Sequence, residues 1–177
     1  MHEVALLRDL LIWHLQSLHD AELQWAAALE ETAAQVTAAD LKQAFNRGST
    51  CAIRHATTIR GILQQLDASS LAGRNAVARD LVQEFRSLKD LAADREVLEA
   101  ALVVTHQCMN HYRIAKYGAA ASFARLLQQY GIAEKLRSML DEEKSTDRSL
   151  TNLAEATLNN RARTVIVENT GWAGSTA

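Results

Sequence analysis

Long apolar stripes with helical spacing run through most of the chain, and charged side chains interrupt each of them near its middle. In the first stripe, Leu18 and Trp25 share one helical face with Glu22. The corresponding interruptions in the later stripes are His55, Arg113 and Glu143. A charge inside a helical protein costs free energy unless another charge or a metal ion neutralises it. The sequence therefore predicts a helical protein with either a metal site or an ion-pair cluster at its centre.

The residue composition favours long, uninterrupted helices. The chain has 177 residues with no proline and seven glycines. It is rich in alanine and leucine, which are strong helix formers, and this argues against β-rich, collagen-like and disordered classes. The apolar periodicity predicts long helices over about residues 3–36, 37–66, 96–130 and 132–163, and a shorter helix over about 76–91.

Three short segments mark the expected helix boundaries. Thr37 to Asp40 resembles a capping box, which predicts the start of the second long helix. Residues 67–75 contain two serines and a glycine, which indicates a break after that helix. Gly131 is expected to follow the last turn of the third long helix.

The lengths of the connections predict how the helices are arranged. Short links make the first and second long helices antiparallel neighbours, and likewise the third and fourth. The link of about thirty residues between the two pairs contains the shorter helix and can carry the chain back along the protein. We therefore predict an all-α fold, a ferritin-like four-helix bundle with a long crossover that contains a fifth, shorter helix. The bundle is expected to span residues 1–163, followed by a mobile tail over residues 164–177.

Charge and hydropathy exclude several classes of partner. The chain mixes 19 basic with 21 acidic residues for a net charge of −2, so we expect no nucleic-acid binding. No run of eighteen apolar residues occurs, so we expect no membrane span. The first residues lack the pattern of a signal peptide, and the two cysteines suit a reducing compartment, which predicts a cytoplasmic protein. We expect Cys51 and Cys108 to be buried, unreactive thiols.

Carboxylate and imidazole side chains on the inner helix faces form a candidate metal site. The main candidates are Glu22, His55, Glu143 and Asp147, and the weaker candidates are Cys51, His106 and Asn110. Such oxygen and nitrogen donors suit iron or manganese. A dinuclear centre in a helical bundle normally uses about four carboxylates. The second long helix has no carboxylate between Asp40 and Asp67, so this inventory is incomplete.

Arg113 argues against two metal ions at this level, because its guanidinium is permanently cationic and would repel them. It could instead pair with Glu143, Glu22 or Asp147 in a buried salt-bridge cluster. The main prediction is therefore a metal-free centre without a cofactor. Two alternatives remain open, a single ion held by the four main candidates and a full dinuclear site.

The third and fourth long helices carry motifs of a known family. Residues 110–118 read Asn-His-Tyr-Arg-Ile-Ala-Lys-Tyr-Gly, and residues 142–147 read Glu-Glu-Lys-Ser-Thr-Asp. These segments resemble the YciF/YciE type of bacterial ferritin-like stress proteins, catalogued as a domain of unknown function, and the resemblance covers roughly residues 3–163. The family pattern is similar to E-H-Y-E-I-A-x-Y-G, in which the two glutamates are taken as metal ligands. This chain has Asn110 and Arg113 in those two positions.

The resemblance implies a cytoplasmic helical protein, often dimeric and linked with stress responses. It leaves three functional hypotheses. The first is a non-enzymatic, metal-free bundle with a degenerate di-iron site, associated with stress or with a protein partner. The second is an iron- or manganese-binding protein with oxidative or peroxide-directed chemistry. The third is a homodimer formed through apolar side chains left over on the first helix, such as Leu10, Ile12 and Trp13.

Overall fold

The computed structural model describes residues 4–70 and 75–163. Within these ranges the chain contains no strand, which confirms the predicted all-α class. The helices are α1 Leu7–Ala33, α2 Ala39–Gln65, α3 Ala76–Leu91, α4 Arg95–Leu126 and α5 Tyr130–Leu153. None of these helices combines the length and apolarity that a bilayer crossing requires. The predicted mobile tail, residues 164–177, lies outside the described residues.

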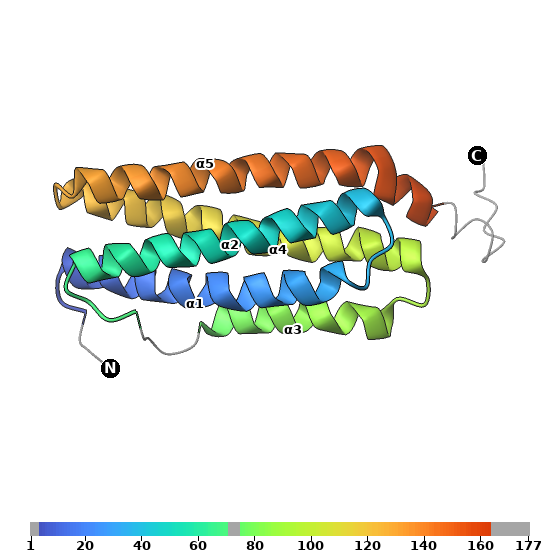
Figure 1. Cartoon of the computed structure of the whole chain (residues 1–177), viewed down its shortest axis with the longest axis horizontal. Helices are drawn as coiled ribbons and strands as arrows, with labels where there is room; N and C mark the ends of the chain where they lie inside the picture. Colours follow the sequence, from blue (N-terminus) through green and yellow to red (C-terminus); the bar gives the residue numbers. More distant parts are fainter. Residues whose placement is uncertain (1–3, 71–74, 164–177) are drawn as a thin grey trace, which may run out of the picture.

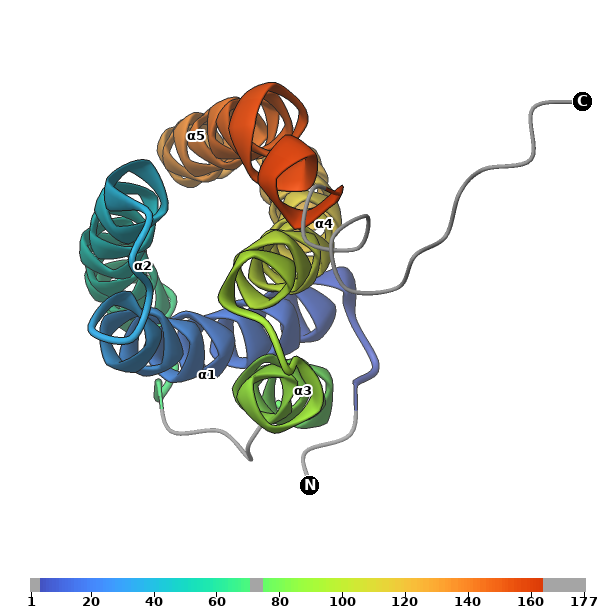
Figure 2. The ribbon, with the colours of Figure 1, turned by 90° about the vertical axis from the view of Figure 1, so that its right-hand side faces the viewer.

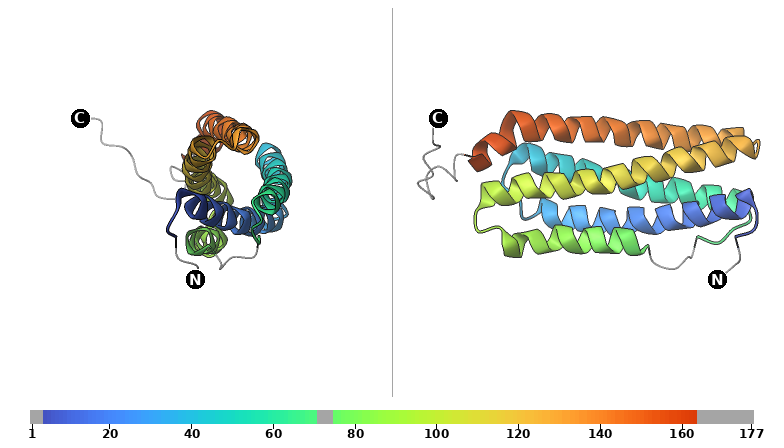
Figure 3. Two further views of the ribbon diagram at one scale, coloured as in Figure 1. Left: turned by 90° about the vertical axis from the view of Figure 1, so that its left-hand side faces the viewer. Right: turned by 180° about the vertical axis from the view of Figure 1, so that it is seen from behind.

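The four long helices α1, α2, α4 and α5 lie side by side along the longest axis of the molecule (Figure 1). Helices α1 and α2 run in opposite directions, and so do α4 and α5 (Figure 1). Views along the axis place α3 outside this group, and it packs against α1 and α4 (Figures 2 and 3). The chain leaves α2 at one end of the molecule, and α3 carries it towards the other end, where α4 begins (Figure 1).

Asn75 fixes the start of α3 and ties the crossover to its neighbours. Its side-chain oxygen accepts a hydrogen bond from the Ala78 amide at 3.0 Å, which is N-cap geometry. Its side-chain nitrogen donates to the Ser17 carbonyl at 3.0 Å and to the Tyr112 hydroxyl at 2.8 Å. Its backbone amide donates to the Asp20 carboxylate at 2.7 Å. The crossover is thereby attached to both α1 and α4.

The start of α2 is stabilised by a distant helix rather than by its own sequence. The predicted capping box at Thr37 to Asp40 is wrong, because the N-cap residue is Ala38 and no side chain of α2 caps it. The Glu99 carboxylate of α4 instead accepts hydrogen bonds from the amides of Thr37 at 2.6 Å and Ala38 at 2.9 Å. A carboxylate at this end also interacts favourably with the helix dipole.

The turn between α4 and α5 also differs from the prediction. Gly131 does not follow α4, because it lies in the first turn of α5. The left-handed residue is Gln128, with a φ angle of 58°. The Gln129 amide donates to the Ala124 carbonyl at 2.9 Å and the Gln128 amide to the Arg125 carbonyl at 3.0 Å. These two bonds form a Schellman motif, which ends α4 at a position where the sequence offers no glycine.

The last long helix changes its hydrogen bonding before it ends. A π-helical turn, Ala154–Leu158, follows α5, and helical structure then continues to residue 163. Leu158 is 1% exposed and packs into the interior. The predicted end of this helix near residue 163 therefore agrees with the structure, although its last part is not a regular α-helix.

Two apolar clusters fill the interior, and a polar layer separates them. The cluster nearer α3 includes Trp25, Leu29, Phe45, Phe85 and Leu102. The cluster nearer the α4–α5 turn includes Leu15, Ile59, Leu63, Leu136 and Met139. The residues of the polar layer, each at most 2% exposed, are Glu22, His55, Asn110, Arg113 and Glu143. All four long helices contribute to this layer, so the polar interruptions of the sequence meet at one level.

Candidate functional site

Arg113 stands at the centre of the polar layer. It extends from α4, and its side chain is 2% exposed. Its Nη1 lies 2.9 Å from Glu22 Oε2 on α1, and its Nη2 lies 2.7 Å from Glu143 Oε2 on α5. The planar guanidinium therefore bridges two buried carboxylates that belong to different helix pairs.

Two other residues of α4 extend the hydrogen bonding of this bridge. Asn110 Oδ1 accepts a hydrogen bond from Arg113 Nη2 at 2.6 Å, and Asn110 Nδ2 donates to the Glu143 carbonyl at 2.9 Å. The Tyr117 hydroxyl donates to Glu22 Oε1 at 2.6 Å. Steps of three and four residues place these side chains on one face of α4. Hydrogen bonds of this kind reduce the cost of burying the charges.

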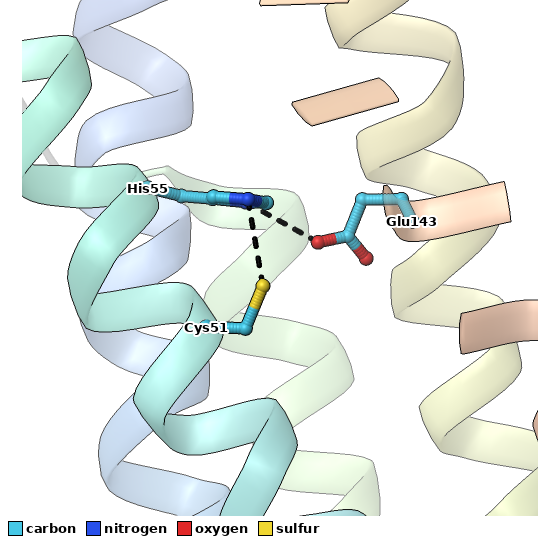
Figure 4. A group of neighbouring side chains, drawn as sticks. All are labelled: Cys51, His55 and Glu143. Carbon is cyan, nitrogen blue, oxygen red and sulfur yellow. Dashed lines mark hydrogen bonds and ion pairs between the residues drawn. The ribbon is translucent and has the colours of Figure 1, made fainter. Parts of the chain in front are cut away.

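His55 presents one ring nitrogen to the layer and the other to its rim. Nδ1 lies 3.3 Å from Glu143 Oε1 and 3.7 Å from Glu22 Oε1. Nε2 lies 3.0 Å from Glu142 Oε2 and 3.4 Å from Cys51 Sγ. Figure 4 shows His55 and Cys51 projecting from α2 towards Glu143. Acidic groups therefore surround the imidazole on both sides, which favours its protonated form.

Arg54 and Glu142 form an ion pair at the rim of the layer. Arg54 Nη1 donates to Glu142 Oε1 at 3.1 Å, and Arg54 Nη2 contacts both Glu142 Oε2 and Cys51 Sγ. The Arg54 side chain is 57% exposed and that of Glu142 is 34% exposed. All three residues line a groove of about 650 Å³ between α2 and α5. The groove gives solvent access to the outer edge of the layer.

The charges of the layer support one another. Burial disfavours the charged form of His55, but contacts with Cys51, Glu143 and Glu22 outweigh burial and raise its pKa to about 12. Burial likewise disfavours the ionised Glu22, yet Arg113 and His55 lower the pKa of that carboxyl group below its usual value. Two buried carboxyl groups thus face two buried cationic side chains.

This balance does not suit a dinuclear metal centre. Two divalent ions are normally met by about four carboxylates, whereas the inner layer supplies Glu22 and Glu143. The Arg113 guanidinium lies between these two carboxylates and already pairs with both. Asn110 adds no negative charge, although it stands where the resembled pattern has a glutamate. The donor set is therefore that of an ion-pair cluster.

Asp147, the fourth main candidate, lies apart from the other three. It is one turn after Glu143 on α5, and its carboxylate is 3.3 Å from Gln107 Nε2 and 3.4 Å from Nε2 of the exposed His111. These contacts place it at the seam between α4 and α5. The structure therefore brings together Glu22, His55 and Glu143, but it does not add Asp147 to them.

His106 is fully buried in an aromatic environment. Its ring centroid lies 5.4 Å from that of Trp25 and 5.5 Å from that of Phe45. Neither of its ring nitrogens has a hydrogen-bond partner within the described part of the chain. Burial, with a smaller contribution from Arg113, lowers its pKa to about 3. His106 is therefore a neutral core residue in this structure.

Two residues of the rim, Arg54 and Glu142, were not among the candidate ligands predicted from the sequence. Glu142 alone indicates a solvated helix face, and Arg54 carries no motif. The prediction that both cysteines are buried is wrong, because Cys51 is partly buried and Cys108 is exposed. The available signal was spacing, since Cys51, Arg54 and His55 lie three and four residues apart on α2.

A comparison with known protein families places this helical chain in a family. The family described as "Domain of unknown function (DUF892)" matches residues 6–163, and the chain belongs to this family. The chain is 30% identical to Protein YciF of Escherichia coli strain K12 over 164 residues, which cover 88% of this chain and 95% of that protein. The resemblance to the YciF type is thereby confirmed.

Three solved structures are similar to this fold. YcfI from Rhodopseudomonas palustris, provisionally described as a structural protein, has a TM-score of 0.80 at 27% identity, and the match covers 85% of this chain and 96% of that one. The E. coli stress protein YciF has a TM-score of 0.73 at 28% identity, with 88% and 99% covered. A protein from Xanthomonas campestris has a TM-score of 0.73 at 17% identity, and the match covers 89% of this chain and 99% of that one. At this low identity the match shows a shared fold alone.

Proposed function

We propose that this chain is a stress-associated protein with a ferritin-like four-helix bundle, in which a buried ion-pair cluster takes the place of a dinuclear metal centre. Helices α1, α2, α4 and α5 with one long crossover correspond to the ferritin-like arrangement. The E. coli relative is described as a stress protein. On this proposal the protein is cytoplasmic and non-enzymatic, and its inner layer holds no iron or manganese.

The bridge that Arg113 makes between Glu22 and Glu143 carries this proposal. A metal ion can offer open coordination positions to oxygen or peroxide, whereas a guanidinium offers none. Its positive charge is also attached to the chain and cannot dissociate. The cluster therefore neutralises the buried charges of the core without providing a reactive centre.

Metal content tests the proposal. Protein purified without chelators is expected to contain well under one iron or manganese per chain, measured by elemental analysis. The double variant Asn110→Glu/Arg113→Glu restores the two glutamates of the resembled pattern. It should become less stable without metal and should gain thermal stability with added Mn²⁺, which the unmodified protein should not. Stoichiometric iron or manganese in the unmodified protein would overturn the proposal.

The alternative function is an iron- or manganese-binding protein with oxidative or peroxide-directed chemistry. The approach of His55 Nδ1 to Glu143 at 3.3 Å and to Glu22 at 3.7 Å favours it, because three donor side chains meet. This alternative predicts that His55→Ala loses bound iron or manganese. If that variant retains as much metal as the unmodified protein, His55 is not a ligand.

We also propose that the protein forms a homodimer through α1. Trp13 is 50% exposed, and the Lys116 ammonium lies 4.7 Å from its ring centroid. An exposed aromatic side chain is typical of association surfaces, although Ile12, the neighbour that the sequence suggested for this face, packs against the core instead. Analytical ultracentrifugation at micromolar concentration should show a dimer that Trp13→Ala weakens. A monomeric unmodified protein would contradict this proposal.

A further inference from the structure

Three donor atoms of different chemistry meet at the rim of the polar layer. Cys51 Sγ lies 3.4 Å from His55 Nε2 and 3.5 Å from Glu142 Oε2. His55 Nε2 lies 3.0 Å from the same Glu142 oxygen. A thiol, an imidazole nitrogen and a carboxylate oxygen therefore form a small triangle between α2 and α5.

The size of this triangle matches a metal coordination sphere. Tetrahedral zinc has bonds of about 2.3 Å to sulfur and about 2.0–2.1 Å to nitrogen and oxygen, which places its ligand atoms about 3.3–3.6 Å apart. The three separations of 3.4, 3.5 and 3.0 Å agree with that range to within about 0.3 Å. We propose that Cys51, His55 and Glu142 bind one thiophilic divalent metal ion such as Zn²⁺.

The helix and the inner layer hold the imidazole ready for this role. Cys51 and His55 are four residues apart, so one face of α2 presents both donors. The opposite ring nitrogen, His55 Nδ1, lies 3.3 Å from Glu143 Oε1 (Figure 4). It also lies 3.7 Å from Glu22 Oε1. An acid behind a ligating histidine orients the ring and makes it a better ligand. Among the described residues Nδ1 makes ion-pair contacts with these carboxylates rather than a hydrogen bond, so the layer supports the ring electrostatically while Nε2 faces the ion.

The donor types select the class of metal. Thiolate with imidazole suits zinc and similar soft or borderline ions, whereas carboxylate-rich sites suit iron, manganese or magnesium. Binding would release the proton of Cys51 Sγ and the proton of His55 Nε2 to solvent. The rim site is thus different in position and chemistry from the inner pair of Glu22 and Glu143, and it goes beyond the proposed function.

Arg54 supplies the positive charge beside these donor atoms in this structure. Its guanidinium contacts both Cys51 Sγ and Glu142, so it is attracted by the same atoms that would hold the ion. Its side chain is 57% exposed, and it can therefore turn into solvent without losing buried packing. The groove beside it would then admit the ion and a water molecule as fourth ligand, as in zinc sites with three protein ligands.

Cobalt substitution tests the ligands directly. Co²⁺ bound by a thiolate gives a sulfur-to-metal charge-transfer band in the near ultraviolet, and a Zn²⁺ competition titration gives the affinity. Cys51→Ala should remove the band and weaken Zn²⁺ binding by more than the roughly 10- to 100-fold caused by loss of an outer support. The matched control is Cys108→Ala, which removes the exposed cysteine and should leave both measurements unchanged.

Arg54→Gln provides a second test, because it removes the competing charge and keeps the side chain hydrophilic. Zn²⁺ should bind at least about 10-fold more tightly to this variant, because a positive charge about 4 Å from a divalent ion weakens its binding by that factor or more even when water screens the repulsion. Circular dichroism confirms that each variant is folded. The proposal is overturned if the unmodified protein shows no thiolate band, if Cys51→Ala keeps it, or if Arg54→Gln binds Zn²⁺ no more tightly. Iron and manganese content is measured separately, so failure here leaves the proposed function to its own test.

Discussion

Two fully buried histidines, His55 and His106, lie in opposite environments of the same interior. His55 lies among the acidic groups of the polar layer, which raise its pKa to about 12 against the effect of burial. His106 lies between Trp25 and Phe45, and burial lowers its pKa to about 3. Burial alone would make both rings neutral. The difference shows that neighbouring charges, not depth, decide whether a buried imidazole carries a proton.

Removal of Arg113, the central cation of the polar layer that surrounds His55, should have the largest effect on stability. Arg113→Met leaves Glu22 and Glu143 buried and without their main partner, which should lower the free energy of unfolding by about 3–5 kcal/mol. Urea denaturation measures the change. The control is Arg86→Met, which breaks the exposed pair with Glu31 and should cost no more than about 0.5 kcal/mol. Equal losses in the two variants would contradict the role assigned to the layer.

Replacement of each histidine by leucine compares their contributions to the free energy of unfolding, and His55 should have the larger one. His55→Leu removes a cation that faces three carboxyl groups, and we expect a loss of about 3 kcal/mol in the free energy of unfolding. Denaturation at neutral pH gives this value. A change of less than about 1 kcal/mol would show that His55 is not held charged by its neighbours.

The pH dependence of stability should also separate the two residues. The pKa of His106 falls from 6.5 to about 3 on folding, so the unfolded chain binds more protons and stability is lost as the pH falls through this window. The loss should be on the order of 2 kcal/mol by about pH 4.5. His55 behaves oppositely, because its contribution is complete below 6.5 and is lost only as the pH rises towards about 12.

Urea titrations at pH 7 and about pH 4.5 test this difference. Other acid-sensitive groups, including Glu22, destabilise the unmodified protein and His106→Leu alike. The unmodified protein should therefore lose more stability than His106→Leu between the two pH values. An identical drop in both proteins would mean that His106 does not titrate differently on folding.

The smallest expected effect is that of His106→Leu, which should raise the free energy of unfolding rather than lower it. His106→Leu replaces a ring whose nitrogens lack hydrogen-bond partners among the described residues with an apolar side chain of similar volume. The free energy of unfolding at pH 7 should rise by about 1 kcal/mol, because no polar atom is then buried unpaired. A loss of stability in this variant would show that His106 has a partner, such as a buried water molecule.

The helices were predictable because their periodicity is local, but their ends were not. The apolar stripes and the absence of proline determine where helices form. The cap of α2 comes from Glu99, some sixty residues away, and no local motif announces it. The turn after α4 uses Gln128 in a left-handed conformation, although Gly131 nearby is the residue with the better intrinsic propensity. The start of α2 therefore depends on hydrogen bonds from a distant helix, which local sequence patterns do not reveal.

The buried ion pairs of the site could be predicted from the sequence better than the contacts at its rim. Arg113 and Glu22 lie on apolar faces, so their burial and their pairing follow from the helical pattern. The helical pattern does not show which of Glu142 and Asp147 contacts His55, because both lie close to Glu143 on α5 and only the neighbouring helices distinguish them. Glu142 faces α2 and meets His55, whereas Asp147 faces α4 and meets Gln107.

The polar layer has a consequence for how the long helices find their alignment. If α4 slid along its neighbours by one helical turn, about 5.4 Å, the Arg113 guanidinium would move towards one of the two apolar clusters and both carboxylates would lose it. Purely apolar surfaces would tolerate such a shift far better, since one leucine can replace another. We expect the ion pairs of the layer to form in only one alignment of the helices. They would then favour that alignment over others that bury a similar apolar area.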